Sequence, residues 1–327
     1  MTTQTPSRSA ASWSFVANKV KIEAPLPYEI VPGVVIRHAT RDERTRALEK
    51  LDQLVGNTNH LGTTIRHWYE FDNRPLPNNP GQTGLVRLAE PEWRYYVVEG
   101  DPNGNVFCDL HRALLLADSG LLLCLDFMDG AEYGGTRFNA WVLQTLFDME
   151  SLFKAPDVIT QTALVEYSSL YARVQPFLYE PKRSEAPEIE QAIMMFDALN
   201  RLPENSTFHA IGLFAIIEML ISHNPKLEDR GDSITHQIKT KMPLLLRLFE
   251  KPIDTSQYFG PAGSDKVWST LYSWRSCIAH GGIADFNVQL KLLRSAEVAQ
   301  SFLEAIVKGL ILQTTKDPQF IRDLKAV

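Results

Sequence analysis

Apolar residues recur at helical spacing through nearly the whole second half of the chain. The pattern predicts helices over residues 187–199, 205–222, 232–249, 265–280 and 286–312, the last as one helix or two. In the fourth of these helices, the stripe expected to be buried consists of Val267, Leu271, Trp274 and Ile278. Consecutive helices with one apolar face each pack against one another, so the pattern predicts an all-α bundle.

The first half mixes two kinds of pattern. Runs of β-branched and aromatic residues predict strands at residues 31–37, 93–99 and 121–127. Helices are predicted at 40–54, where Thr40 and Glu43 have the spacing of a capping box, and at 138–152. Residues 73–84 are rich in Asn, Pro and Gly and are predicted to form a loop. This half therefore predicts an α+β fold.

A cluster of prolines and charges at residues 179–187 is predicted to separate the two halves. Residues 1–20, rich in Ser and Thr, are expected to be a disordered tail. We assign residues 21–180 to an α+β domain that senses or docks a partner, and residues 186–327 to the helical domain. Two domains are an ordinary outcome for a chain of 327 residues.

Charge is divided unevenly between the halves. The net charge of −6 excludes a uniformly basic nucleic-acid coat protein, but residues 1–199 hold 18 basic and 26 acidic side chains, whereas residues 200–327 hold 15 and 13. The second half is therefore the less repulsive surface for a polyanion. The chain has three cysteines and no apolar signal core near residue 1, and its longest apolar stretch, at 208–221, is too short to span a bilayer. These features predict a cytoplasmic protein without a membrane segment.

Arg275 and His280 lie near the end of the helix predicted at 265–280, which Gly281 and Gly282 are expected to terminate. Five residues rotate a helix by about 140° beyond one full turn, so the two side chains do not share a face, but they can converge if the helix ends at His280. A histidine there meets the negative end of the helix dipole and can move protons near neutral pH, and an arginine can fork onto phosphate oxygens. Together they supply what metal-free RNA cleavage by the substrate's own 2′-hydroxyl needs, which is one group that moves protons and one fixed cation that stabilises the phosphorane.

The segment RSCIAHG, from Arg275 to Gly281, resembles the HEPN superfamily signature, and the frame LYSWRSCIAHGG resembles its ApeA-like branch. The upstream run FAIIE, which ends at Glu218, fits the same branch. The resemblance covers residues 186–315 and implies an all-α HEPN-type helical bundle that forms a homodimer with two motifs in one cleft. It further implies a metal-independent endoribonuclease without a cofactor, of the kind found in toxin–antitoxin, CRISPR-linked or abortive-infection antiviral systems.

On this interpretation Arg275 and His280 are catalytic, as phosphate clamp and general acid and base, and Ser276 and Glu218 support them. Many active members carry Asn, Asp or His directly after the arginine, where this chain has Ser276, whose hydroxyl can still donate to phosphate. Glu218 lies in an otherwise apolar helix, so a partner is expected for it. It either orients Arg275 or His280, or it forms a structural ion pair.

Two other functions stay open. The first is a non-catalytic HEPN module for dimerisation or partner binding, in which Arg275 pairs with Glu218 and His280 bonds a helix-end carbonyl. The second is a helical phosphate- or nucleotide-binding protein in which Arg275 grips a phosphate. The partners expected on the ribonuclease interpretation are RNA and a second copy of the chain, with a trigger or an antitoxin at the α+β domain.

Other patterns add little. The aromatic residues at 93–96 either offer stacking surfaces to a nucleic acid or belong to a half-buried strand. No metal site and no cofactor are expected, and three scattered histidines lack Cys or carboxylate partners at ligand spacing, namely His209, His223 and His236.

Overall fold

The computed structural model describes residues 12–55, 65–101, 105–118, 120–129, 135–138, 152–203, 206–224 and 233–326. The chain divides into two compact units, Met1–Ala172 and Arg173–Val327. The first is mixed α/β and the second is helical, as the sequence predicts. The division falls near the end of α6 (Gln161–Val174), somewhat before the Pro-rich cluster at 179–187, which belongs to the second unit.

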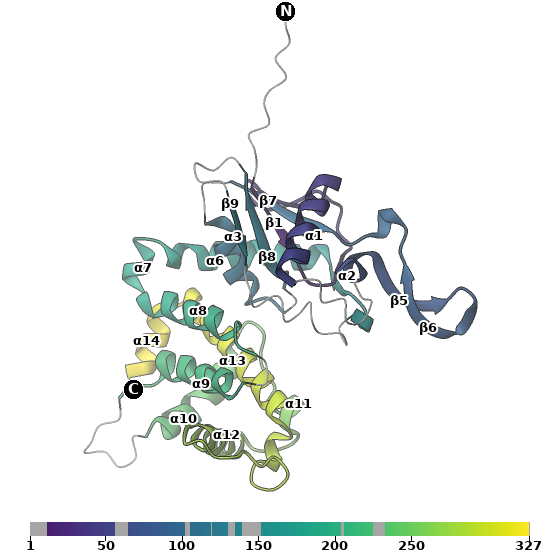
Figure 1. Ribbon diagram of the computed structural model, residues 1–327. Helices are drawn as coiled ribbons and strands as arrows, with labels where there is room; N and C mark the ends of the chain where they lie inside the picture. The colour runs from purple at the N-terminus through teal and green to yellow at the C-terminus, as the bar shows by residue number, and fades with distance from the viewer. Residues whose placement is uncertain are drawn as a thin grey trace, which may run out of the picture. The chain divides into compact units, whose positions relative to one another are not determined.

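A six-stranded antiparallel sheet forms the centre of the first unit (Figure 1). Its strands, in spatial order, are β3 (Tyr28–Val31), β4 (Val34–His38), β7 (Tyr96–Gly100), β1 (Ser12–Val16), β8 (Leu123–Met128) and β9 (Gly135–Phe138). The prediction of a disordered tail over residues 1–20 is wrong for the part that is described. Ser12–Val16 is a fully buried strand between β7 and β8, because Trp13 and Phe15 alternate with small serines that fit a covered sheet.

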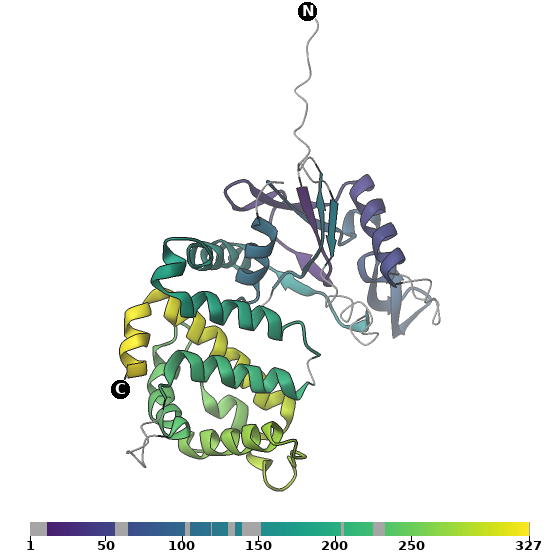
Figure 2. The same cartoon turned by 60° about the vertical axis from the view of Figure 1, so that its left-hand side comes forward.

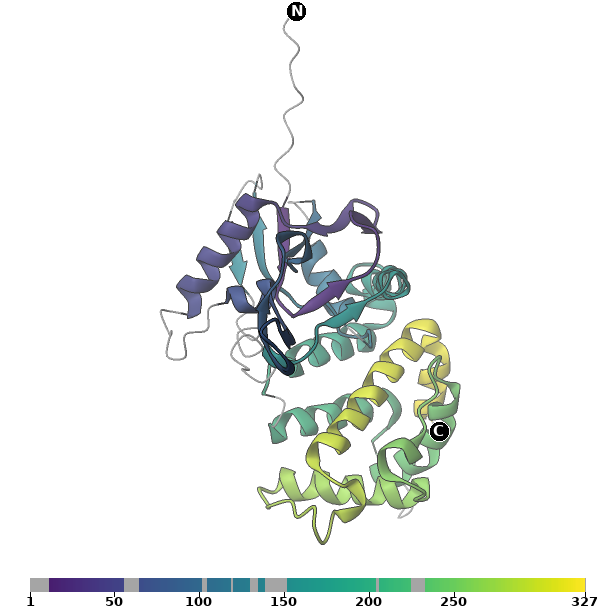
Figure 3. The ribbon, with the colours of Figure 1, turned by 90° about the vertical axis from the view of Figure 1, so that its right-hand side faces the viewer.

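One face of this sheet carries a hydrophobic core of the unit. Helix α1 (Arg41–Val55) lies along it (Figure 3) and contributes Leu48 and Leu51 to a cluster with Trp13 and Phe15. The predicted capping box is confirmed, since the Thr40 amide donates to Glu43 Oε2 at 2.8 Å and the Glu43 amide donates to Thr40 Oγ1 at 3.3 Å. The sequence therefore fixes where this helix starts.

Several short elements complete the first unit. They are α2 (Arg66–Glu70), η1 (Glu90–Glu92), α3 (Val106–Leu114), a parallel pair of β2 (Val20–Ile22) with β10 (Asp157–Ile159), and a hairpin of β5 (Phe71–Leu76) with β6 (Asn79–Arg87). The hairpin contradicts the loop predicted at 73–84, because a Pro- and Asn-rich tip still lets the flanking residues pair. The strand predicted at 31–37 is two strands joined by a turn at Gly33, with φ 77°. The helix predicted at 138–152 lies almost wholly outside the described residues.

Tyr95 and Tyr96 are buried side chains of the first unit, so the strand interpretation of the aromatic run holds, with β7 beginning at Tyr96.

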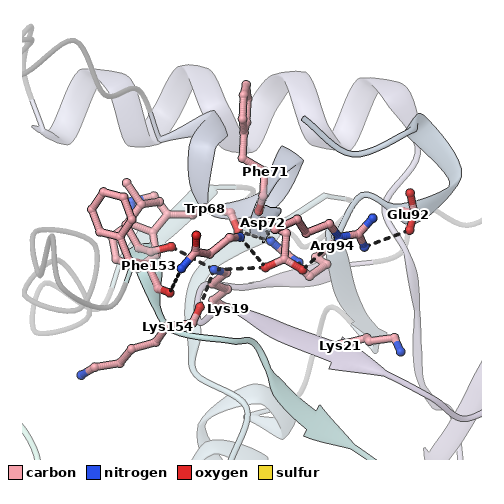
Figure 4. A network of polar contacts seen from close by, with 12 residues as sticks. Lys19, Lys21, Trp68, Phe71, Asp72, Glu92, Arg94, Phe153 and Lys154 are labelled. Atoms are coloured by element: carbon pink, nitrogen blue, oxygen red, sulfur yellow. Dashed lines mark hydrogen bonds and ion pairs between the residues drawn. The ribbon is translucent and has the colours of Figure 1, made fainter. Parts of the chain in front are cut away.

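In the same unit, two buried cations share one carboxylate (Figure 4). Lys19 Nζ lies 3.6 Å from Asp72 Oδ1, and Arg94 Nη1 lies 3.3 Å from Asp72 Oδ2. Burial lowers the pKa of both Lys19 and Arg94, and the charge of Asp72 opposes that effect. Asp72 therefore keeps two buried charges in place.

All regular elements that the structure describes in the second unit are helices. These are η2 (Gln175–Leu178), α7 (Lys182–Glu185), α8 (Pro187–Leu199), α9 (Thr207–Ile221), α10 (Ile234–Leu248), α11 (Thr255–Phe259), α12 (Ser264–Ala279), η3 (Lys291–Leu293), α13 (Ala296–Lys316) and α14 (Pro318–Ala326). The predicted helices are confirmed apart from the last, which starts ten residues later than expected because Ser295 caps it. Among the described residues, no helix combines the length and apolarity that a membrane crossing demands.

Helix α9 is the central helix of this unit, and α8, α9 and α12 lie in successive layers (Figure 2). It is apolar on all sides, with Phe214 and Ile217 fully buried, because α8, α10, α12, α13 and α14 all pack against it. Gly212 allows the close approach of α8, since a Cβ there would lie 2.2 Å from Leu199 Cδ2. Glu218 is carried on this helix and faces α12.

Candidate functional site

Helix α12 ends at the predicted motif. Gly281, with φ 71°, donates from its amide to the Ile278 carbonyl at 3.2 Å, and the Gly282 amide donates to the Cys277 carbonyl at 2.8 Å. These two bonds form a Schellman motif, in which a left-handed residue closes the helix. His280 is the last residue before that turn. The glycines therefore stop the helix where the sequence predicts, and they place His280 at its carboxyl end.

The stripe predicted to anchor α12 is buried. All four of its residues are covered by the bundle, namely Val267, Leu271, Trp274 and Ile278. Trp274 packs edge-on against Phe214 of α9 and against Phe286 in the segment after α12, with ring centroids 6.3 and 5.8 Å away. This packing fixes the rotation of α12 about its axis and so decides which way its polar residues point.

Arg275 points towards α9, where Glu218 accepts a hydrogen bond from it. The distance from Arg275 Nη2 to Glu218 Oε2 is 3.2 Å, and the side chains are 39% and 15% exposed. The pair confirms the expectation that Glu218 has a charged partner. Because the guanidinium is only partly covered, its outer face remains accessible to a phosphate.

Tyr272 adds a third polar group at the same contact. Its ring lies 5.5 Å from that of Phe214. Burial raises the pKa of its hydroxyl, and the charge of Glu218 raises it further, while Arg275 acts in the opposite direction. The sequence predicts no role for this tyrosine, although it stands three residues before Arg275, where two helical side chains are neighbours. That spacing was the available signal.

His280 and Ser276 lie apart from this cluster. Both side chains are exposed, and the His280 ring makes no hydrogen bond or ion pair with any residue that the structure describes. The His280 amide donates to the Ser276 carbonyl at 3.2 Å. Within one chain, the structure thus joins Arg275 to Glu218 and does not join Arg275 to His280, as the rotation of about 140° between them dictates.

Metal-binding groups do not gather in the described part of the chain, where no cluster of three His, Cys, Asp or Glu residues could hold an ion. His209 Nδ1 lies 2.8 Å from Gln300 Nε2, and His223 Nδ1 lies 3.0 Å from the Lys325 carbonyl. Both histidines hold helices of the bundle together.

Comparisons of the chain with protein-family models, curated proteins and solved structures give no match. The chemistry of the α9–α12 contact is therefore what supports any assignment.

Proposed function

We propose that the second unit is an HEPN-type, metal-independent endoribonuclease, with Arg275 as phosphate clamp and His280 as general acid and base. The observation that carries the proposal is the end of α12. The Schellman turn leaves His280 exposed at the carboxyl end of a helix, and the partly exposed Arg275 is oriented by Glu218 from the neighbouring helix. A fixed cation and an exposed imidazole on one helix end are the groups that metal-free RNA cleavage uses.

In the proposed reaction the 2′-hydroxyl of RNA attacks the adjacent phosphorus. His280 accepts the hydroxyl proton as the 2′-oxygen attacks and then delivers a proton to the departing 5′-oxygen. Arg275 stabilises the charge that develops on the non-bridging oxygens, and the exposed Ser276 hydroxyl donates to one of them. The 2′-oxygen–phosphorus bond forms as the phosphorus–5′-oxygen bond breaks. The products are a 2′,3′-cyclic phosphate and a 5′-hydroxyl.

The proposal includes a homodimer. Arg275 and His280 of one chain lie on different faces of α12, so one chain does not by itself present both to one phosphate. A second copy that brings its own helix end alongside supplies the missing group. The setting that we propose is cytoplasmic, as an antiviral abortive-infection or toxin effector, with a trigger or an antitoxin bound at the first unit.

Two observations at Arg275 favour two other candidate functions. An Arg275–Glu218 ion pair is also what a non-catalytic scaffold would use to join α9 to α12, and a partly exposed arginine is equally suited to a bound phosphate or nucleotide. A scaffold would show no His280-dependent activity. A nucleotide-binding protein would release a nucleotide when the purified chain is denatured.

The test is incubation of the full chain with total RNA in EDTA, compared with His280→Ala. His236→Ala is the matched control, because His236 is exposed on α10 of the same unit. The proposal expects new 2′,3′-cyclic phosphate ends with wild type and with the control, and none with His280→Ala. Equal cleavage by all three proteins would assign the activity to another site or a contaminant. If none of the three proteins cleaves RNA, and cells show no His280-dependent toxicity, the non-catalytic scaffold is favoured over the ribonuclease.

A further inference from the structure

Three polar atoms at the α9–α12 contact are not used by the proposed mechanism. Glu218 Oε1, the Tyr272 hydroxyl and Arg275 Nε are all buried, and none has a hydrogen-bond partner of good geometry among the residues that the structure describes. A buried polar atom without a partner costs free energy, so folded proteins rarely leave one. Three such atoms at one contact indicate that the groups are arranged for one another.

Two of the three atoms are complementary. The Tyr272 hydroxyl can donate, and an ionised carboxylate oxygen such as Glu218 Oε1 can only accept. Burial raises the pKa of Tyr272 most, and the charge of Glu218 and a hydrogen bond to its carboxylate raise it further, so the two groups lie within reach of each other although their geometry falls short of a well-formed bond. Phe214 holds the tyrosine ring from the turn of α9 before Glu218. A hydrogen bond from this hydroxyl to the carboxylate would satisfy both atoms.

We propose that Tyr272 is a positioning residue of the site, which donates its hydroxyl to Glu218 Oε1 and so leaves only Oε2 to hold the Arg275 guanidinium. This inference rests on the proposed ribonuclease function. Tyr272 does not touch RNA, because its hydroxyl is buried, and it acts through Glu218.

The Tyr272 hydroxyl and Arg275 Nε are both donors that can reach for Glu218 Oε1, and which of them binds it decides how firmly the carboxylate holds the guanidinium. Arginine prefers to fork onto a carboxylate with two parallel N–H bonds, and Arg275 Nε is the second donor of such a fork. Without the tyrosine hydroxyl, Oε1 turns towards Nε and the carboxylate holds the guanidinium with both oxygens. The cation is then more fully neutralised and displaced from the phosphate that it serves. The loss falls on the chemical step, where charge develops, more than on RNA binding.

A double-mutant cycle in the full chain tests the proposal, with kcat and KM measured on one RNA for wild type, Tyr272→Phe, Glu218→Ala and the double variant. Tyr272→Phe keeps the ring contact and removes the hydroxyl, and should lower kcat about fivefold to tenfold with KM nearly unchanged. In the Glu218→Ala background it should have no further effect. Tyr258→Phe is the matched control, because the Tyr258 ring packs on Phe302 of α13, and its kcat should equal that of wild type.

A second pair of variants tests whether a hydrogen-bond donor is needed at position 272. Tyr272→His keeps an N–H group and should retain more kcat than Tyr272→Leu, which has none. Three results would each overturn the inference while the ribonuclease function stands. They are a wild-type kcat in Tyr272→Phe, the same loss of kcat with and without Glu218, and equal kcat in the histidine and leucine variants. If wild type shows no His280-dependent cleavage, the proposed function fails, and the role of Tyr272 in it fails too.

Discussion

Glu218 and Arg275 stand 57 positions apart in the chain, yet the carboxylate of one accepts a hydrogen bond from the guanidinium of the other at 3.2 Å. The pair joins the last turn of the apolar helix α9 to the last turns of α12. It confines a flexible arginine without covering it, which is why the outer face of the guanidinium can serve a phosphate.

Arg275→Lys should separate the charge of this residue from its geometry. Lysine keeps the positive charge but lacks the planar fork, so we expect the rate of RNA cleavage to fall about 100-fold or more. The side chain is 39% exposed, so the free energy of unfolding should change by only about 1 kcal/mol. Single-turnover cleavage and urea unfolding measure the two effects. Arg247→Lys, on the exposed face of α10, should change neither.

Gly281→Ala should destabilise the chain through backbone conformation alone. A Cβ at Gly281 would meet nothing within 4 Å, but the residue has φ 71°, which costs a non-glycine residue about 1–2 kcal/mol. Gly263→Ala, at the other end of α12, is the matched control, since its Cβ also meets nothing and its φ is −64°. Its loss of unfolding free energy should be smaller than that of Gly281→Ala, because the lower entropy of the unfolded chain, worth about 0.4–1 kcal/mol, offsets the preference for glycine at this N-cap position. Equal losses in the two variants would contradict the proposed cause.

His209 should make stability depend on pH. Burial lowers the pKa of His209 below its ordinary value of about 6.5, so the unfolded chain binds a proton more readily than the folded chain. The stabilisation is therefore complete above about pH 6.5 and is lost as pH falls towards the lower folded pKa. Urea unfolding at pH 7 and pH 5.5 measures the loss. His209→Gln should flatten this dependence, and an unchanged slope would show that other groups cause it.

Asp72→Asn should leave two buried cations without their shared carboxylate. Lys19 and Arg94 are 7% and 4% exposed, and breaking a buried ion pair from one side costs about 3–5 kcal/mol. Chemical unfolding should show a loss of this order. Asp52→Asn, on the exposed face of α1, should leave the free energy of unfolding within about 0.5 kcal/mol of wild type. A small effect of Asp72→Asn would mean that backbone carbonyls alone satisfy both cations.

Helices with local signals could be predicted from the sequence. Helix α8 was predicted residue for residue, and α12 to within one residue at each end, because apolar spacing, caps and glycines are all local. The strand at Ser12–Val16 could not be predicted, since its pattern is only five residues long and its partners lie far along the chain. The hairpin at Phe71–Arg87 was missed because its tip carries turn residues that usually mark a loop.

The candidate site was predictable only in part, for a related reason. The end of α12 follows from Gly281 and Gly282, and a charged partner for Glu218 follows from its apolar surroundings. The contribution of Tyr272 depends on the rotation of α12 against α9, which the packing of Trp274 sets. Such a rotation is a property of tertiary packing, so the three-residue spacing places Tyr272 beside Arg275 but does not place either side chain against Glu218.

The central position of β1 has a consequence for how the first unit folds. Phe15 pairs with Val97, and Trp13 pairs with Phe127, so the strand joins partners that lie roughly eighty and more than a hundred positions further along. During synthesis on the ribosome, this segment emerges before both of its neighbours and stays unpaired until they have left the exit tunnel. The high contact order makes sheet closure slow. A deletion through Val16 would therefore do more than shorten the chain, because it would split the sheet between β7 and β8 and expose two new edges to aggregation.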